Sequence, residues 1–394
     1  MAIVLTPFAG LDLVYAAAEP HATPHSNQTP FRGVHFNPQV RADMPDFPWL
    51  LFYPEHRETV RRALEELVRE ARVNFIDIFV MIPHTLAKSA VGPQAGQTLA
   101  EWANIAYLDN VAAFIDDCHA AGISLEIDLA CNLWIPHSVD SEHHLSNSGH
   151  WPKADDTPWD EAATWYSEVI EYVEAHTAHP ESIAMWSMMG NHEFGAAEPV
   201  LWDREDLPAV TTSTEQFVKR VWPVFRAAGK RPKASPIMLP IFSANPYWSA
   251  RPPLARLSAF SNLKKWLVDD LALPPDYWVM TTYPFCDPAP DGFHYLRAIL
   301  KILGPESAGR LVSTDFKWFD REPKDSILAP QGKSGADVLE WHFKKCAEYG
   351  FSGWWIWAYQ DCGKEAFGLR GATGEWRQEL LPAIRVQYPP STKP

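Results

Sequence analysis

Eight stretches with the character of a β-strand alternate along this chain with eight stretches that have a helical pattern. The strand candidates span residues 32–36, 75–82, 125–131, 183–189, 237–242, 278–283, 311–315 and 353–358. The helical candidates span residues 56–72, 104–121, 160–176, 214–228, 254–271, 295–303, 335–349 and 375–386. Several helical stretches are amphipathic, with apolar residues on one face and charged residues opposite. Strands and helices that alternate at this spacing predict a parallel sheet.

The connections between these stretches differ in length on the two sides of the predicted sheet. Links from a helix to the next strand are short, and four of them carry a glycine suited to a left-handed helix cap: Gly122, Gly229, Gly304 and Gly350. Links from a strand to the next helix are long, at about residues 83–101, 132–159, 194–211 and 318–332. Such loops are usually functional. Eight units with long loops at one rim predict an α/β fold, a (β/α)8 TIM barrel whose site lies at the C-terminal rim.

The alternating pattern also predicts the domains. We expect an N-terminal arm over residues 1–30, a catalytic barrel over residues 31–388 and a disordered tail over residues 389–394. A doubly wound open sheet would alternate in the same way, but the GxGxxG phosphate fingerprint expected after its first strand is absent.

Composition disfavours several classes of partner. The net charge of -15 argues against nucleic acid and anionic membranes, because either polyanion would be repelled. No apolar run approaches membrane-spanning length. The five cysteines form no CxxC pair and no disulfide framework, and the N-terminus lacks the basic segment of a secretory signal, so we expect a cytoplasmic protein. The sequence does not define the oligomeric state.

Two of the strand candidates lead into a carboxylate. IAMWSMMGNHEF carries Glu193, and LVSTDF carries Asp315. Both would lie at the C-terminal rim of a parallel barrel, where such proteins carry their chemistry. Two carboxylates that face one pocket are the minimum equipment for cleaving a glycosidic bond. Asp361, at the end of the eighth strand candidate, is the alternative to Asp315 for the second carboxylate.

The neighbours of the two carboxylates predict different roles for them. Trp186 and Phe194 would shield Glu193 from water, and desolvation keeps a carboxylic acid protonated near neutral pH. We therefore expect Glu193 to act as a general acid towards the leaving oxygen. Lys317 would favour the ionised form of Asp315, which would then attack as a nucleophile or activate water.

The order of these motifs resembles that of the clan A glycoside hydrolases, the superfamily that includes the cellulase-like family 5. The segment WSMMGNHEF is similar to the family's W-x-L-x-N-E after strand 4, and VSTDFK takes the place of the strand 7 nucleophile. TYPF is similar to the family's H-x-Y-P at strand 6, and GWWIW matches its aromatic strand 8. The resemblance covers most of residues 31–386 and rests on motif order more than on close identity.

This resemblance implies a (β/α)8 barrel with Glu193 as acid/base and Asp315 as nucleophile. It implies a glycoside hydrolase that cleaves an O-glycosidic bond in an oligosaccharide, polysaccharide or glycoside by a retaining double displacement. The expected partner is a carbohydrate substrate, and neither a cofactor nor a metal is expected.

Three features depart from the family pattern. His192 stands between Asn191 and Glu193, and the nucleophile position carries aspartate where the family has glutamate. The arginine expected near the end of strand 2 is missing, and His84 or His35 is the candidate replacement. The shorter aspartate leaves inversion open, since retaining enzymes hold the carboxyl groups about 5 to 5.5 Å apart and inverting ones roughly 6.5 to 9.5 Å.

Polar and aromatic residues near the predicted strand ends are candidates for sugar binding. Polar groups would satisfy sugar hydroxyls, and indole rings would stack on the sugar face. The candidates are His35, Asn37, His84, Asn132, Trp134, Asn191, Tyr283, Trp318 and Trp357. Because side chains alternate along a strand, Trp355 and Trp357 are expected to point one way and Trp354 the other.

Two other functions remain open. A metal-dependent hydrolase on the same barrel is one, although the first strand ends in HFN and the histidine-rich segment SEHHLSNSGH has no HxH or HExxH spacing. A non-catalytic carbohydrate-binding barrel is the other, because of the aspartate at the nucleophile position. The sequence does not define the sugar, the linkage, the anomeric configuration, or exo versus endo action.

Overall fold

The computed structural model describes residues 30–40, 48–80, 82–88, 93, 96–129, 159–188, 207–236, 258–281, 294–307, 309–316, 334–361 and 368–386. Apart from Pro30, the predicted N-terminal arm lies outside these residues, and so does the predicted tail over residues 389–394.

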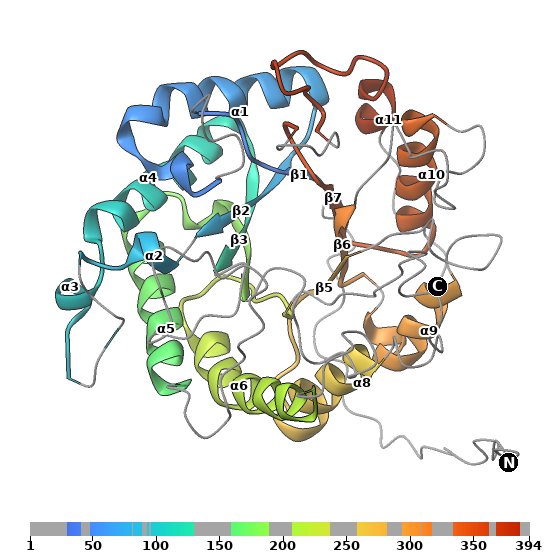
Figure 1. Cartoon of the computed structure of the whole chain (residues 1–394). Coiled ribbons are helices and arrows are strands. Elements are labelled where there is room, and N and C mark those ends of the chain that lie inside the picture. Colours follow the sequence, from blue (N-terminus) through green and yellow to red (C-terminus); the bar gives the residue numbers. More distant parts are fainter. Residues whose placement is uncertain are drawn as a thin grey trace, which may run out of the picture.

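Within the described residues, seven strands form one parallel sheet, in the order β4-β3-β2-β1-β7-β6-β5. The strands are β1 (Phe31–His35), β2 (Phe75–Val80), β3 (Ser124–Leu129), β4 (Ile183–Met188), β5 (Trp278–Thr281), β6 (Leu311–Phe316) and β7 (Gly353–Ile356). The sheet curls around a central axis, and the helices form a ring outside it (Figure 1).

The segment around residues 232–235 lies between β4 and β5, where the eighth strand of a barrel is needed. Lys233 pairs in parallel with Trp186 of β4, and Ala234 pairs in parallel with Tyr277 beside β5. The amide of Ala234 donates to the carbonyl of Trp186 at 2.8 Å. The barrel is therefore closed at this level, as the (β/α)8 prediction requires. The predicted fifth strand, residues 237–242, lies outside the described residues, and pairing begins before it, at Lys233.

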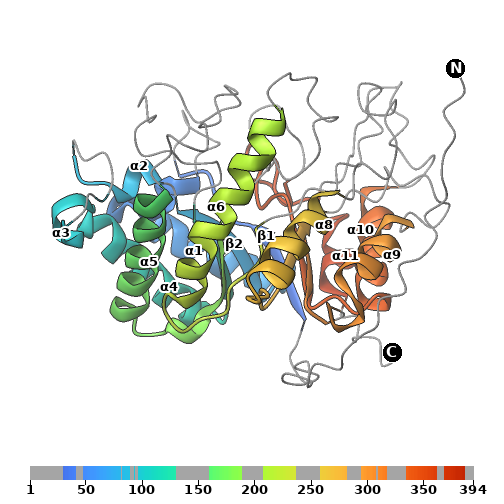
Figure 2. The same cartoon turned by 90° about the horizontal axis from the view of Figure 1, so that it is seen from below.

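The helices flank the strands, with α4, α5 and α6 towards one side of the side view and α8 to α11 towards the other (Figure 2). The α-helices are α1 (Arg57–Ala71), α2 (Ile82–Thr85), α3 (Leu99–Trp102), α4 (Ile105–Ala121), α5 (Trp159–His176), α6 (Leu207–Ala227), α8 (Ser258–Lys264), α9 (His294–Leu303), α10 (Gly335–Glu348) and α11 (Leu381–Arg385). Shorter helical turns are η1 (Pro48–Phe52), η2 (Pro54–His56), η3 (Pro180–Ser182), η8 (Pro305–Ser307) and the π-helical η6 (Lys265–Asp270). None of the described helices is long and apolar enough to cross a membrane.

Two helix boundaries differ clearly from the prediction. Helix α6 begins at Leu207 instead of residue 214, and Pro208 suits the first turn of a helix because it needs no amide donor there. The last helix was predicted over residues 375–386 but begins only at Leu381. The chain before it is drawn into pairing, since the amide of Arg377 donates to the carbonyl of Leu369 at 2.9 Å.

The four predicted glycine caps are confirmed by their backbone angles. Gly122 has a φ of 74° at the end of α4, and Gly229, Gly304 and Gly350 have φ values of 60°, 95° and 71°. At Gly122 this left-handed turn lets the amide donate to the carbonyls of Cys118 and His119, which satisfies the helix end. Each cap permits a short link between the helix and the strand that follows it.

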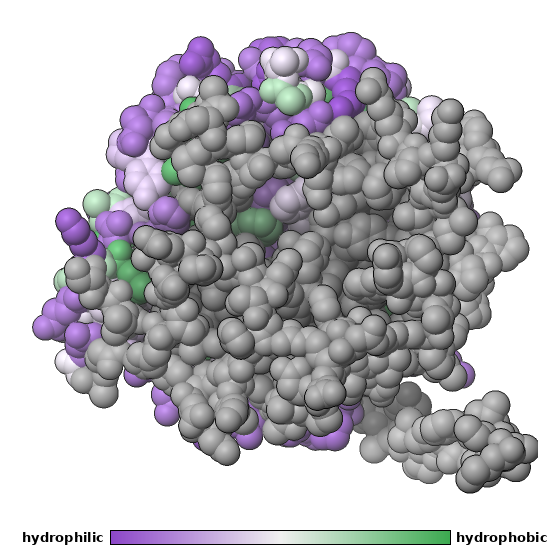
Figure 3. Space-filling model, in the orientation of Figure 1, coloured by the Kyte–Doolittle hydropathy of each residue, from purple (hydrophilic) through white to green (hydrophobic). Residues whose placement is uncertain are grey.

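The buried apolar side chains in the described part of the chain form two cores. The larger core lies between the helices and the outer face of the sheet, and it includes the fully buried Trp102, Trp165 and Trp222. The smaller core fills the barrel at the N-terminal ends of the strands, with Phe75 and Val312 among its members. Hydrophilic side chains dominate the coloured surface over α1, and a small hydrophobic patch lies recessed near the middle of the view along the barrel (Figure 3). Because apolar side chains fill the barrel at the N-terminal ends of the strands, an active site is expected at the C-terminal ends.

Candidate active site inside the barrel

Three titratable side chains from neighbouring strands share one layer inside the barrel. The register pairs His35 of β1 with Asp77 of β2, and Asp77 with Glu126 of β3. All three side chains are buried. Nδ1 of His35 lies 2.6 Å from Oδ2 of Asp77. An ionised carboxylate only accepts hydrogen bonds, so Asp77 makes Nδ1 of His35 a donor and orients the imidazole ring.

Aromatic rings hold the His35 imidazole from the side. The ring of Trp357, which follows β7, stacks on it with a centroid distance of 4.2 Å and an interplanar angle of 8°. Phe79 of β2 lies against it at a centroid distance of 4.3 Å. The Trp357 side chain is only partly buried, so this stack connects the buried polar layer to the open side of the barrel.

The aromatic strand β7 has the predicted alternation of side chains. Trp355 points into the barrel, where its Nε1 donates to Oε2 of Glu126 at 2.9 Å. Trp354 points outward and stacks on Phe343 of α10 with a centroid distance of 3.6 Å. Trp357 shares the inward side with Trp355, so the orientation expected for all three indoles is confirmed.

Glu126 is a buried carboxylic acid rather than a carboxylate. Burial raises the pKa of Glu126 to about 8, and the negative charge of Asp77 raises it further, while hydrogen bonds from Ser187 and Trp355 act in the opposite direction. Glu126 therefore holds a proton at neutral pH. A neutral Glu126 reduces the repulsion that Asp77, Glu126 and the equally buried Asp128 would otherwise create.

The chain after β1 is tied to the chain after β7. The side-chain nitrogen Nδ2 of Asn37 donates to the backbone carbonyl of Gln360 at 3.0 Å. The side-chain oxygen Oδ1 of Asn37 accepts from the backbone amide of Gln360 at 3.1 Å. The amide of Tyr359 donates to the carbonyl of His35 at 2.8 Å. These bonds fix the two segments that flank the His35–Trp357 stack.

Asp361, the alternative second carboxylate, is engaged in a bidentate ion pair. Its two oxygens each lie 2.7 Å from a guanidinium nitrogen of Arg377, and Oδ1 also accepts from the amide of Gly368 at 2.8 Å. Arg–carboxylate pairs of this geometry are strong and directional. We therefore assign Asp361 to anchoring the segment at residues 368–377.

Asp315 lies near the C-terminal end of β6, beside β7. Ser313 pairs with Trp354, and Phe316 pairs with Ile356. Between these two pairs, β6 therefore contains one residue more than β7. This register shift is a β-bulge that includes Asp315. Bulges of this kind are frequent beside active sites.

No known family model and no curated protein matches this sequence. Solved structures do match. A GH5_18 protein from Bifidobacterium longum subsp. infantis has a TM-score of 0.60 at 12% identity, over 91% of this chain and 78% of that chain. A GH5_18 protein from Streptomyces cattleya in complex with Manb1-4GlcNAc has a TM-score of 0.60 at 13% identity, over 93% of this chain and 82% of that chain. The exo-beta-1,4-mannosidase Op5Man5 from Opitutaceae bacterium strain TAV5 has a TM-score of 0.56 at 13% identity, and this chain, covered over 91%, spans only 58% of its length. The chain has a GH5-like barrel fold.

On this GH5-like fold, the structure brings three predicted substrate-binding residues together. His35, Asn37 and Trp357 lie at the adjoining ends of β1 and β7. Five of the other predicted substrate-binding residues and one predicted catalytic residue lie outside the described residues: Asn132, Trp134, Asn191, Tyr283, Trp318 and Glu193. Their roles stay predictions.

His84 lies apart from this group, in α2. Its Nδ1 is 2.8 Å from the hydroxyl oxygen of Tyr53, and its ring stacks on Tyr107 of α4 with a centroid distance of 5.7 Å. Burial lowers the pKa of His84 to about 4, so the ring is neutral at pH 7. A neutral ring cannot supply the charge of the missing strand 2 arginine.

Asp77 and Glu126 were not predicted as site residues, although the sequence carries a signal for both. Each acid lies between two apolar residues of its strand that pack in the outer core: Ile76 and Ile78 in FIDIFV, and Leu125 and Ile127 in SLEIDL. An acid in the middle of a fully buried parallel strand faces the barrel interior. That rule, applied to every strand, would have found the buried polar layer.

Replacing Asp77 with asparagine is expected to lower the free energy of unfolding by about 1–3 kcal/mol, because a neutral amide makes a weaker buried bond to His35 than a carboxylate does. Urea unfolding of the purified protein measures this change. The exposed Asp269 is a matched control, and Asp269→Asn is expected to change stability by less than about 0.5 kcal/mol. Equal losses in the two variants would contradict a structural role for the His35–Asp77 bond.

Proposed function

We propose that this protein is a glycoside hydrolase in which Glu193 is the acid/base and Asp315 is the nucleophile. The proposed reaction is a retaining double displacement at an O-glycosidic bond. Glu193 would protonate the leaving oxygen while Asp315 attacks the anomeric carbon, and Glu193 would then deprotonate the water that releases the sugar.

The observation that carries the proposal is the β-bulge at Asp315. Val312 pairs with Gly353 of β7 and belongs to the inner core. Without a bulge, alternation would put residues 312, 314 and 316 on the inner face. The extra residue reverses the alternation, because Phe316 pairs with Ile356, a residue of the outer core. We propose that this register shift turns Asp315 towards the inside of the barrel.

The surroundings of His35 support the same site. The proposed nucleophile comes from β6, which neighbours β7, and Trp357 at the end of β7 stacks on His35. An indole at this position offers a flat apolar face for a sugar ring. Asp77 lies on β2, and its carboxylate is hydrogen-bonded to Nδ1 of His35. We propose that His35 takes the place of the arginine that family 5 enzymes carry near the end of strand 2.

The names of solved structures with a similar fold guide the choice of substrates to test. Their names include an exo-beta-1,4-mannosidase, a hyperthermophilic beta-glucosidase and a complex with Manb1-4GlcNAc. We therefore propose a β-linked hexose as the substrate, with β-mannosides and β-glucosides as the first compounds to test.

The dependence of activity on the leaving group tests whether Glu193 is the general acid. Glu193→Ala is expected to lose about 10²–10⁴-fold in kcat/KM on alkyl or sugar glycosides and much less on 2,4-dinitrophenyl glycosides, whose departure needs no proton. Steady-state kinetics on both series, together with the anomer of the first product by NMR, tests role and stereochemistry. An equal loss on both series would argue against an acid role. Sugar binding by a wild-type protein without any hydrolysis would favour a carbohydrate-binding barrel instead.

A further inference from the structure

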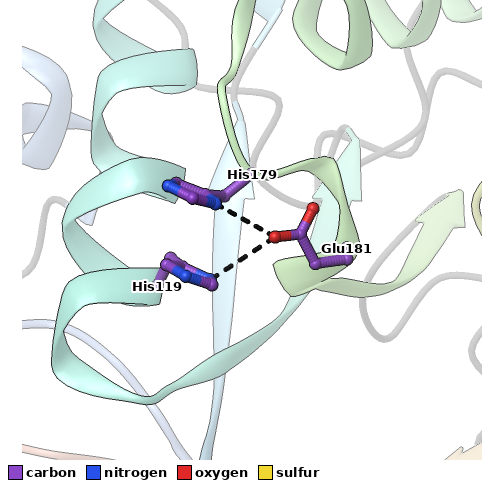
Figure 4. A group of neighbouring side chains, drawn as sticks. All are labelled: His119, His179 and Glu181. Atoms are coloured by element: carbon purple, nitrogen blue, oxygen red, sulfur yellow. Dashed lines mark hydrogen bonds and ion pairs between the residues drawn. The ribbon is translucent and has the colours of Figure 1, made fainter.

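Two histidines and a glutamate meet at the end of the barrel opposite to the proposed active site. His119 lies in the last turn of α4, and His179 and Glu181 lie just before β4 (Figure 4). One oxygen of Glu181 faces both imidazole rings in this view. Among the described residues, this is the one group of three or more His, Cys, Asp or Glu side chains whose candidate ligand atoms all lie within 4.8 Å of one another.

The backbone that carries these side chains is fixed to α4 by a separate acid. Oδ1 of Asp116 accepts hydrogen bonds from the hydroxyl of Thr177 at 2.7 Å, the amide of Ala178 at 2.9 Å and the amide of His179 at 3.1 Å. The segment with His179 therefore has a defined position relative to the helix with His119. Preorganisation of this kind reduces the entropy that ligand binding costs.

The distances from the two imidazoles to the Glu181 oxygen suit a small tetrahedral cation. Nδ1 of His179 lies 3.0 Å from Oε1 of Glu181, and Nδ1 of His119 lies 3.7 Å from the same oxygen. Two ligand atoms bound to one tetrahedral zinc ion at the usual bond lengths are roughly 3.4 Å apart. The observed distances bracket that value.

The present ring orientation would have to change on binding. The two imidazole rings stack in parallel, with a centroid distance of 3.6 Å and an interplanar angle of 1°. In-plane lone pairs of parallel rings do not converge on one point, so each ring must tilt towards the other. The side chains have room for this, since 43% of His119 and 39% of His179 are exposed.

We propose that His119, His179 and Glu181 form a binding site for a divalent transition metal of the Zn²⁺ class, with water at the remaining position. Two imidazoles and one carboxylate are a donor set that such ions accept and that Ca²⁺ and Mg²⁺ do not prefer. Hydrogen bonds, first from the Glu181 backbone and then from His179, lower the pKa of the Glu181 carboxyl, which keeps it ready as a ligand. The bound ion joins the end of α4 to the start of β4 and stabilises the fold there.

Titration calorimetry of the tag-free protein with ZnSO₄ at pH 7.5 tests the site. Wild type is expected to bind one ion, and His119→Gln and His179→Gln are each expected to weaken binding more than tenfold. His176→Gln is the matched control, because His176 is an exposed histidine on the adjacent α5 that lies outside the cluster.

The outcome against the proposal is also defined. No binding by wild type at 100 μM Zn²⁺, or unchanged binding in a variant with both histidines replaced, would overturn it. The test is independent of the glycosidase proposal. Removal of zinc with EDTA is expected to lower Tm without changing kcat, whereas loss of activity that zinc restores would indicate a metal-dependent hydrolase.

Discussion

Replacing Asp315 with asparagine is expected to lower kcat/KM by on the order of 10⁴-fold, on activated and unactivated glycosides alike. An amide neither attacks the anomeric carbon nor stabilises the positive charge that develops on the sugar, so no leaving group compensates for its loss. A 10⁴-fold loss corresponds to about 5.5 kcal/mol of transition-state stabilisation. Steady-state kinetics with 2,4-dinitrophenyl and alkyl glycosides measures the effect.

Asp361 offers the matched control for this prediction, since it is the other carboxylate that the sequence places at the rim. Asp361→Asn is expected to lower Tm, because the bidentate pair with Arg377 is weakened. Its kcat/KM is expected to stay within about tenfold of wild type in the fraction that remains folded. A larger kinetic loss in Asp361→Asn than in Asp315→Asn would show that the second carboxylate had been misassigned.

Replacing Glu126 with glutamine is expected to remove a pH-dependent loss of stability. Burial, reinforced by Asp77, raises the pKa of Glu126 from 4.5 to about 8. Between these values the folded protein keeps a proton that the unfolded chain releases, so wild-type stability falls as pH rises from about 4.5 to about 8. The cost integrates to roughly 4 kcal/mol by the upper end of that range. Glutamine has no proton to lose and preserves the shape of the side chain.

Urea unfolding at pH 5, 6.5 and 8.5 tests this prediction. Glu126→Gln is expected to be similar to wild type at pH 5 and clearly more stable than wild type at pH 8.5. Glu340, an exposed residue of α10, is the control, and Glu340→Gln is expected to follow the wild-type pH profile. A stability difference between wild type and Glu126→Gln that is constant across this pH range would mean that Glu126 titrates normally in the folded protein.

The sequence was a reliable guide to the elements of the barrel. Apolar periodicity located each described strand to within a few residues, and the glycines after the helices gave the short links. Alternation along β7 was enough to separate the inward Trp355 and Trp357 from the outward Trp354. These features are local, because the position of a side chain within its own helix or strand follows from the period of that element.

The contacts between elements could not be obtained in this way. His35 and Asp77 are 42 residues apart, and Glu126 and Trp355 are 229 residues apart. Which residues meet depends on the register between parallel strands, and that register is set by the packing of whole helices against the sheet. The β-bulge at Asp315 has the same origin, because it exists only in the pairing of β6 with β7.

The sequence by itself thus determined the fold class, the eight repeating units and the rim on which to look for carboxylates. The tertiary structure alone decided that His35 and Asp77 form a buried pair, that Asp361 belongs to Arg377, and that His119 meets His179 at the other end of the barrel. The physical reason is that hydrophobic periodicity specifies which face of an element is buried, whereas the partner of a polar side chain is specified by elements far away in the chain.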